Sequence, residues 1–453
     1  MGRHHKPSGS AASDSSVART PASSGNDAAS GSGWRPRARA TGRDYREPFT
    51  VVQWVLSIFL MLGAVATVVG LVVLWPASSE PRVAPEFSAT SPLPKSQVSG
   101  EVVIRDQGAC NTPSVGRVFD SAPVTPLSTQ EAQCERAIVR IDSGQNAGKR
   151  TLLLIGEHPG DPQLKEGEKV RLAEQESADG QVGYTFTDYQ RGHKLLGWGI
   201  ATTLAIVLIG AWRGARSLVG LAITLGAVGV FLIPALLHGG PPLALAVVCG
   251  SAVLYLVLYL VHGFSWKTSA ALAGTVISLV LAAVLAHFAI GQNQLRGLGN
   301  EDNLLIQLYL PDVTVTGLML CGFIIGALGV LNDVTIAQAS TVNELADIEP
   351  DANPWRLFAG AMKVGRDHIA SMVYTLVLSY TGAALPLLLL LSVADRPFGE
   401  VLTSDVMATE LLRSAIGALA LALAVPITTA IAAFSVVGQR RLDAAVEQGV
   451  KLP

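Results

Sequence analysis

Seven long apolar blocks occupy nearly all of the chain from residue 195 onward. They are 195–212, 217–237, 242–261, 269–290, 313–331, 369–391 and 411–437. Each is close to the roughly 20 residues that a helix needs to cross a hydrocarbon layer about 30 Å thick. Only helices and closed barrels satisfy their backbone in lipid, and none of these blocks alternates like a barrel strand. The sequence therefore predicts a mainly α-helical integral membrane protein.

An eighth apolar block lies upstream, with Trp54 and Trp75 near its ends, where interfacial aromatic residues belong. It is too long for the core of a signal peptide, and its polar leader extends to Pro48. We interpret residues 50–75 as a retained first span; cleavage after residues 76–78 is the weaker alternative. The fold class predicted is a bundle of about eight transmembrane helices.

The basic residues of the short loops predict the orientation of the bundle. Lys and Arg gather before span one, after spans two, four and six, and in the C-terminal tail, whereas the alternate loops are poorer in them. Both termini are therefore expected in the cytoplasm, with residues 76–193 outside. The predicted domains are a disordered segment 1–49, span 50–75, an extracytoplasmic region 76–193, a seven-helix domain 194–438 and a tail 439–453.

Residues 76–193 are expected to form a spacer followed by a small β domain. Short β-type runs occur at 100–105, 137–141, 150–155, 169–172 and 184–189, divided by turn residues. About five strands in this length suggest a small OB-like barrel. Cys110 and Cys134 lie in this region, where a disulfide can form, and neither has a second Cys or His at metal-ligand spacing.

One polar face continues the apolar block 313–331 toward residue 347. Asp333, Ser340 and Glu344 share a helix face, and Asn332 and Asn343 extend its polar surface. Acidic groups are costly in hydrocarbon, so they face a cavity, a partner or the interface. Two interpretations remain open: a transport path with a cation or proton at the acids, or an amphipathic helix at the headgroups.

The seventh span carries a second stripe of hydroxyl groups. Ser371, Thr375 and Ser379 line one face, and such hydroxyls contact a neighbouring helix or line a path. Pro386 and Pro426 lie inside spans seven and eight, where a proline permits a kink. Broken helices are common around transporter sites, although proline is also frequent in membrane helices generally.

Glu410 and Arg413 lie one turn apart and are expected to form an interfacial ion pair of little energetic value. The chain has no Walker-type phosphate loop, H-E-x-x-H or G-x-S-x-G motif. We therefore expect neither an enzyme nor a resident cofactor or metal. The formal net charge of −2 argues against a nucleic-acid partner.

Several motifs in order resemble the YibE/F-like family of bacterial multi-span membrane proteins. The likeness spans residues 99–437 and includes 326–329 followed by Asp333-Val334, Ser340 and Asn343-Glu344. It continues through 371–376, Leu385-Pro386-Leu387, 410–414 and 424–429. The resemblance implies a protein of the bacterial cytoplasmic membrane, often described as a permease, and brings no established substrate or catalytic residue.

Two functions remain open at this point. The first is a permease or exporter of a small solute or ion, with the polar faces of spans six and seven as its path. The alternative is a non-transporting scaffold or accessory subunit of an envelope complex, in which the extracytoplasmic domain holds an envelope protein. The lipid bilayer is the surrounding medium in both. The residues do not determine the oligomeric state.

Overall fold

The computed structural model describes residues 50–87, 96–124, 133–156, 161–176, 182–393 and 396–447. The predicted disordered segment 1–49 and the last residues of the tail lie outside this part. Within it, long helices dominate, and a small antiparallel sheet lies between the first and second of them in sequence. The prediction of a mainly helical protein with a small β region is confirmed.

Among the residues that the structure describes, six helical segments are long and apolar enough to cross a membrane. They are α1 (Val51–Val73), the continuous segment α3–η1–α4 (Gly192–Ala227, Val228–Leu232, Ile233–Leu237), α5 (Pro242–His262), α6 (Trp266–Gln292), α8 (Val315–Ile348) and α12 (Asp405–Glu447). A seventh span results if α9 (Pro354–Ala383) and α10 (Leu385–Ser392) are taken together. The number of about eight spans stays a prediction.

The segment Gly192–Leu237 differs from an ordinary single span. Its 46 residues would form a straight helix of roughly 70 Å, about twice the thickness of the hydrocarbon layer. The helix is interrupted at Ala211, whose φ is 48° and ψ is −136°. Beyond this break Gly214 approaches the carbonyl oxygen of Ile206 so closely that a Cβ atom would lie 2.3 Å from it. The break falls at the end of the apolar block 195–212, shortly before the block 217–237 begins.

The predicted seventh span is also broken. The helices α9 and α10 meet at Ala384 with a bend of 64°. Pro386 occupies the first turn of α10, where its missing N–H costs no helical hydrogen bond. In α12, by contrast, Pro426 lies inside a helix that continues on both sides.

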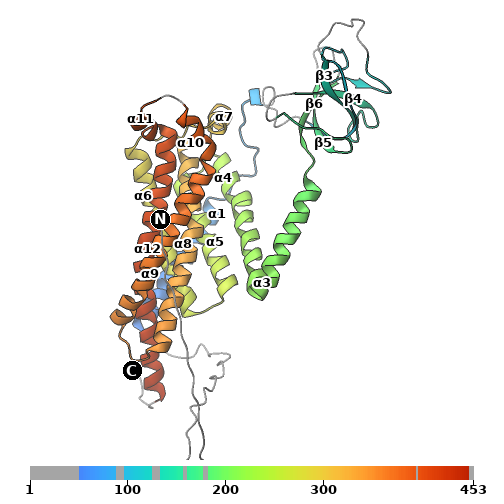
Figure 1. Ribbon diagram of the computed structural model, residues 1–453. Helices are drawn as coiled ribbons and strands as arrows, with labels where there is room; N and C mark the ends of the chain where they lie inside the picture. The colour runs from blue at the N-terminus through green and yellow to red at the C-terminus, as the bar shows by residue number, and fades with distance from the viewer. Residues whose placement is uncertain are drawn as a thin grey trace, which may run out of the picture. The chain divides into compact units, whose positions relative to one another are not determined.

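Helices α6, α8, α9 and α12 run side by side and form the centre of the bundle (Figure 1). The apolar window of α6 is 67% buried, whereas that of α1 is 17% buried. Two short helices, α7 (Glu301–Tyr309) and α11 (Phe398–Leu402), lie at one end of the bundle (Figure 1). We call this the α7 end. The central helices bury mostly alanine, with some valine and leucine, and the small side chains suit close packing.

The β domain is a six-stranded antiparallel sheet of order β2-β4-β3-β1-β5-β6. The strands are β1 (Gln97–Ala109), β2 (Val118–Phe119), β3 (Gln133–Ile141), β4 (Arg150–Ile155), β5 (Lys169–Glu176) and β6 (Val182–Tyr189). All five predicted runs lie within strands, and the two-residue β2 is additional. Alternating apolar residues such as Val102, Val139 and Leu172 point into one core.

Gly116 joins the two ends of this sheet. Its N–H donates to the carbonyl of Leu152 in β4, and its carbonyl accepts from the N–H of Tyr184 in β6. Its φ of +72° is a conformation that suits glycine. These bonds close the sheet toward a barrel, while the OB-like assignment stays a prediction.

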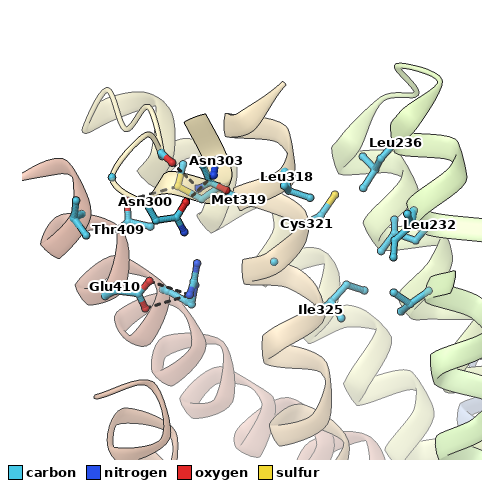
Figure 2. A pocket seen from close by; sticks show the side chains of 17 residues that line it. Leu232, Leu236, Asn300, Asn303, Leu318, Met319, Cys321, Ile325, Thr409 and Glu410 are labelled. Carbon is cyan, nitrogen blue, oxygen red and sulfur yellow. Dashed lines mark hydrogen bonds and ion pairs between the residues drawn. The ribbon is translucent and has the colours of Figure 1, made fainter. Parts of the chain in front are cut away.

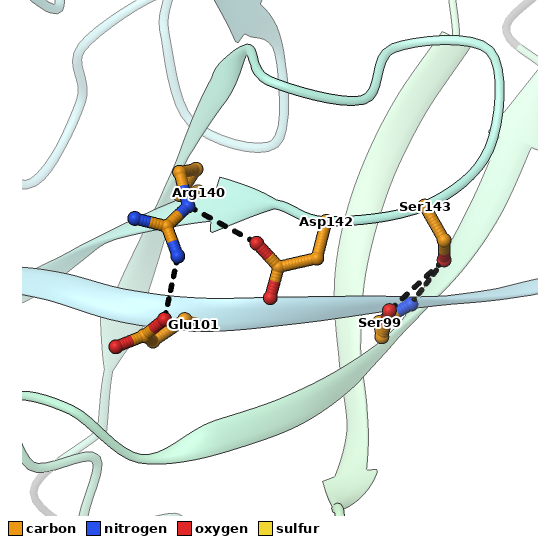
Figure 3. A network of polar contacts seen from close by, with 5 residues as sticks. All are labelled: Ser99, Glu101, Arg140, Asp142 and Ser143. Carbon is orange, nitrogen blue, oxygen red and sulfur yellow. Dashed lines mark hydrogen bonds and ion pairs between the residues drawn. The ribbon is translucent and has the colours of Figure 1, made fainter.

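Two polar contacts and one covalent bond stabilise the central strands. Arg140 donates to Glu101 at 2.6 Å and to Asp142 at 3.0 Å, and both the N–H and hydroxyl groups of Ser99 contact the hydroxyl of Ser143 (Figure 3). The candidate pair Cys110 and Cys134 forms a disulfide at the other ends of β1 and β3.

Residues 79–87, which follow α1, contact the α7 end of the bundle. Arg82 forms a bidentate ion pair with Asp312, at 2.8 and 2.6 Å. The N–H of Ala84 donates to the carbonyl of Tyr309. His238, which follows α4, contacts the carbonyl oxygens of Ser79 and Pro234 at 2.9 and 2.7 Å. We call residues 79–87 the spacer segment.

Candidate functional site

A cavity of about 400 Å³ opens at the α7 end of the bundle. Its wall comes from η1 and α4, from the loop before α7, and from the first turns of α8 and α12 (Figure 2). Because residues far apart in sequence form it, no single motif marks it. We call this space the α7 cavity.

One side of the α7 cavity is polar. Asn300, Asn303, Thr409, Glu410 and Arg413 line it. Glu410 and Arg413 form an ion pair at 3.0 Å, and both side chains are only about a quarter exposed, 26% and 27%. The Nε atom of Arg413 finds no hydrogen-bond partner among the described residues. This pair is therefore not the simple interfacial pair that its one-turn spacing suggested.

Two aromatic rings hold the guanidinium group of Arg413. Its Cζ atom lies 5.2 Å from the ring centre of Phe323 and 5.9 Å from that of Tyr380. Such cation–π contacts favour the charged group where water is scarce. The positively charged guanidinium group of Arg413 is thus held at the polar side of the cavity, with the carboxylate of Glu410 beside it.

The opposite side of the α7 cavity is apolar. It includes Val228, Leu232 and Leu236 of the η1–α4 segment and Leu318 and Ile325 of α8 (Figure 2). A π-helical turn such as η1 is rare in proteins overall, and the turns that do occur often lie at functional sites. A pocket with an apolar wall and a few convergent polar groups is suited to a small amphipathic solute.

Exposed residues recur along one face of α8 that starts at the α7 cavity, with the half-buried Ala337 and Ser340 between the last two of them. Gly322, which lines the cavity, is followed at helical spacing by Gly326, Gly329, Asp333 and Glu344, all of them exposed. A Cβ atom at Gly322 or Gly329 would meet nothing within 4 Å. The distance from Gly322 to Glu344 is about 33 Å at the helical rise, close to the thickness of the hydrocarbon layer.

The predicted path residues of α8 lie on or beside this face. Asp333 and Glu344 are exposed, while Ser340 and Asn343 are half-buried and donate to carbonyls of their own helix. The Oδ1 atom of Asn332 is buried and has no partner among the described residues. The helix continues unbroken to Ile348, as the polar pattern predicted.

The predicted path residues of α9 lie elsewhere. Ser371, Thr375 and Ser379 are exposed on the surface of the chain. Thr375 donates to the carbonyl of Ser371, and Ser379 to that of Thr375, so these hydroxyls are satisfied within their own helix. Pro386 is exposed in α10 and Pro426 is half-buried in α12. None of the ten predicted path residues lines the α7 cavity.

Sequence reasoning missed the cavity because its chemistry is spread over four segments. The one available signal was the pair Glu410 and Arg413, whose spacing was recognised and whose surroundings were not. Within the described residues, no cluster of three or more His, Cys, Asp or Glu side chains could hold a metal ion.

These features define a multi-span helical membrane protein with a cavity at one end of its bundle and an accessory β domain. Residues 198–438, more than half of the 453-residue chain, match the model of the YibE/F-like protein family. The chain belongs to this family. The β domain lies outside the matched region, although the resemblance noted in the sequence began at residue 99. No curated protein and no solved structure matches the chain.

Proposed function

We propose that this integral membrane protein is a permease of the bacterial cytoplasmic membrane that moves a small amphipathic solute. The observation that carries the proposal is the α7 cavity, which combines an apolar wall with the half-buried pair Glu410 and Arg413. A cavity of about 400 Å³ falls in the range of small-molecule pockets. The protein has no catalytic role in this proposal.

The orientation follows the distribution of basic residues in the loops. Both termini lie in the cytoplasm, and the disulfide-linked β domain and the α7 end lie outside. The α7 cavity is then the outward-facing binding site. The face of α8 from Gly322 to Glu344 provides the route toward the cytoplasm, with Asp333 about halfway along it.

Tyr380 separates the cavity from the rest of this route. Its hydroxyl lies over Gly326, where a Cβ atom would be 2.7 Å away, and its ring contacts Arg413. The bend between α9 and α10 begins four residues later, at Ala384. A change of that bend would move Tyr380 and open or close the connection, as broken helices do in secondary transporters.

Alternating access to the two ends of this route tests the proposal. Thr409→Cys places a thiol in the α7 cavity, and Glu344→Cys places one at the far end of the α8 face. Both are made with Cys249 and Cys321 replaced by alanine, and right-side-out and inverted vesicles are treated with a membrane-impermeant thiol reagent. A permease predicts labelling of the two positions from opposite sides, with modification of one lowering the rate at the other.

Flux measurements complete the test. In proteoliposomes, a solute that protects Thr409→Cys from labelling is expected to be transported, and Asp333→Asn is expected to slow its transport. Independent labelling of the two thiols, together with no protection by any solute of a broad panel, would contradict the permease. A stoichiometric cross-link from the β domain to an envelope protein would then support the scaffold function.

A further inference from the structure

Along the central helices the buried side chains are apolar, except at one level of the bundle, where they are polar. On α6 the buried residues Thr275 and Ser278 lie between Ala271 and Ala282. On α8 and α12 the same layer continues. Its six side chains, all with an exposed fraction of 0%, are Thr275, Ser278, Thr335, Gln338, Thr428 and Thr429. We call them the polar layer.

Contacts between helices link several members of the polar layer. The hydroxyls of Thr275 on α6 and Thr335 on α8 lie 2.6 Å apart. Gly274 approaches α12 so closely that a Cβ atom would lie within 2.0 Å of the Thr428 hydroxyl. Gly365 of α9 lies against both the Gln338 amide and Val425. Helices α6, α8, α9 and α12 therefore meet at this layer.

Apolar clusters enclose the polar layer on both sides. Toward the α7 end lies a buried cluster that includes Leu331 and Leu421. Toward the start of α1 lies another, which includes Val342 and Ala433. Water has no wide route through such packing, so the hydrogen bonds of the layer must be satisfied locally.

Three oxygen atoms of the polar layer are left without partners. Thr275 and Thr429 donate to the carbonyls of Ala271 and Val425 on their own helices, and the Nε2 of Gln338 donates to the carbonyl of Ala361. The Oγ of Ser278, the Oε1 of Gln338 and the Oγ1 of Thr428 have no hydrogen-bond partner among the described residues. Buried polar atoms are normally paired, so each of these calls for a ligand, an ion or a water molecule.

The polar layer lies about midway along the membrane-spanning helices, the level at which transporter ion sites are found. Gly438 of α12 lies against Thr50, the residue that caps α1. Thr428 is ten residues further along α12, or about 15 Å, which is half the thickness of the hydrocarbon layer. Thr275 is likewise ten residues from Ser265, the cap of α6. Coupling ions of secondary transporters bind near this midplane.

We propose that the polar layer binds one monovalent alkali cation, with Na⁺ as the ion that fits it. The donors are neutral hydroxyl and amide oxygens, and the layer contains no carboxylate, imidazole or amine. A divalent cation prefers carboxylate oxygens, and a proton would need a basic group. The close helix approach at Gly274 favours a small ion. Only the role of coupling ion rests on the proposed permease function; binding itself does not.

Thermal unfolding of the purified full-length protein in detergent micelles tests this site without any solute. At constant ionic strength, NaCl is expected to raise the Tm by several degrees over choline chloride, saturably and more than KCl does. Thr428→Val removes the oxygen at nearly constant volume and abolishes the shift, whereas Thr428→Ser keeps the oxygen and retains it. Thr67→Val is the matched control, because among the described residues the Thr67 hydroxyl bonds only to Gly63 of its own helix α1.

Each outcome decides between a cation and water. Equal Tm values in Na⁺, K⁺ and choline would overturn the proposal and assign water to the three oxygens. So would a Na⁺ shift that persists when Thr428→Val is combined with Ser278→Ala. If Thr428→Val does not fold, Ser278→Ala alone reports on the site, since it deletes one unpartnered hydroxyl. If Na⁺ raises the Tm but the protein transports no solute in the flux measurements, the permease function is contradicted and the cation site is retained.

Discussion

The guanidinium group of Arg413 shows how one residue gains its function from its surroundings. Its charge is balanced by Glu410 and by the rings of Phe323 and Tyr380, while its Nε atom has no hydrogen-bond partner in the described part of the chain. An exposed pair of this spacing contributes little to stability. A pair that is three-quarters buried depends on both partners, because removal of one leaves a charge without compensation.

Glu410→Gln is accordingly expected to destabilise the protein by about 1–3 kcal/mol. The measurement is the midpoint of thermal unfolding in detergent. The matched control is Glu400→Gln, which breaks an exposed pair with Arg396 at 3.6 Å, with side chains 60% and 52% exposed. This control should change stability by less than about 0.5 kcal/mol. Equal effects of the two variants would show that the cavity pair is no more than a surface pair.

His238 is a second residue whose role comes from its neighbours. Both of its ring nitrogens face carbonyl oxygens, those of Pro234 and Ser79, and a carbonyl can only accept. Both contacts are hydrogen bonds only when both nitrogens carry hydrogen, and these contacts with Pro234 and Ser79 raise the pKa of His238 above its usual value; nearby Asp312 adds to the effect. The contact with the spacer segment is complete below pH about 6.5 and is lost as pH rises through the raised pKa.

Hydrogen exchange of residues 79–87 measures this dependence. Protection, corrected for intrinsic exchange rates, should fall as the pH rises above about 6.5 in the wild type. In His238→Gln, which has no titrating ring, protection should be low and independent of pH. The substitution leaves both partners of the Arg82–Asp312 ion pair unchanged, so this contact is expected in both proteins. A wild-type protection that does not change with pH would remove His238 from the attachment of the spacer segment.

At the scale of elements, glycine decides how closely the central helices pack. A Cβ atom at Gly274 would lie 2.0 Å from the Thr428 hydroxyl and 3.1 Å from the Thr428 Cα atom. The second of these is backbone and cannot move without separating α6 from α12. By contrast, a Cβ atom at Gly226 of α3 would meet nothing within 4 Å. The two positions look alike in sequence, since both are glycines inside apolar helices.

Gly274→Ala is therefore expected to cost about 1–3 kcal/mol through overpacking. Gly226→Ala should be neutral or stabilising by up to about 1 kcal/mol, because alanine is the better helix former. Thermal unfolding of both variants in the same detergent gives the comparison. If Gly274→Ala were as stable as the wild type, the close approach of α6 and α12 would be wrong, and the polar layer would lose its geometry.

Element boundaries also show where sequence reasoning stopped. The apolar blocks located the long helices because lipid dictates their length. For the bend of 64° at Ala384 the sequence offered only Pro386, which permits a kink without predicting its angle. The π-helical turn η1 had no sequence signal. Backbone irregularities of this kind depend on the neighbours that re-satisfy the freed hydrogen bonds.

At the scale of the whole molecule, the β domain and the helical bundle have separate cores. The β core contains residues such as Val102, Val139 and Leu172, and the disulfide between Cys110 and Cys134 closes a loop across it. The free cysteines Cys249 and Cys321 lie in the helices and are buried. Reduction of the protein should therefore act on the β domain alone.

Cys110→Ala combined with Cys134→Ala should lower the stability of the β domain by about 3 kcal/mol, the value for a loop of this length. Limited proteolysis is the measurement: cleavage within residues 96–189 should become faster, while the bundle fragment remains intact. A matched pair, Cys249→Ala with Cys321→Ala, should leave cleavage of the β domain unchanged. Simultaneous loss of bundle resistance in the first variant would show that the two cores unfold together.

The sequence by itself determined that this is a membrane protein with several long apolar helices, where the β strands run and to which family the protein belongs. These properties follow from local quantities: apolar length, alternation and motif order. Only the tertiary structure decided that Glu410 and Arg413 line a cavity and that six polar residues of three helices form one buried layer. Such groupings depend on which helix faces meet, and that choice is made by packing between segments far apart in the chain.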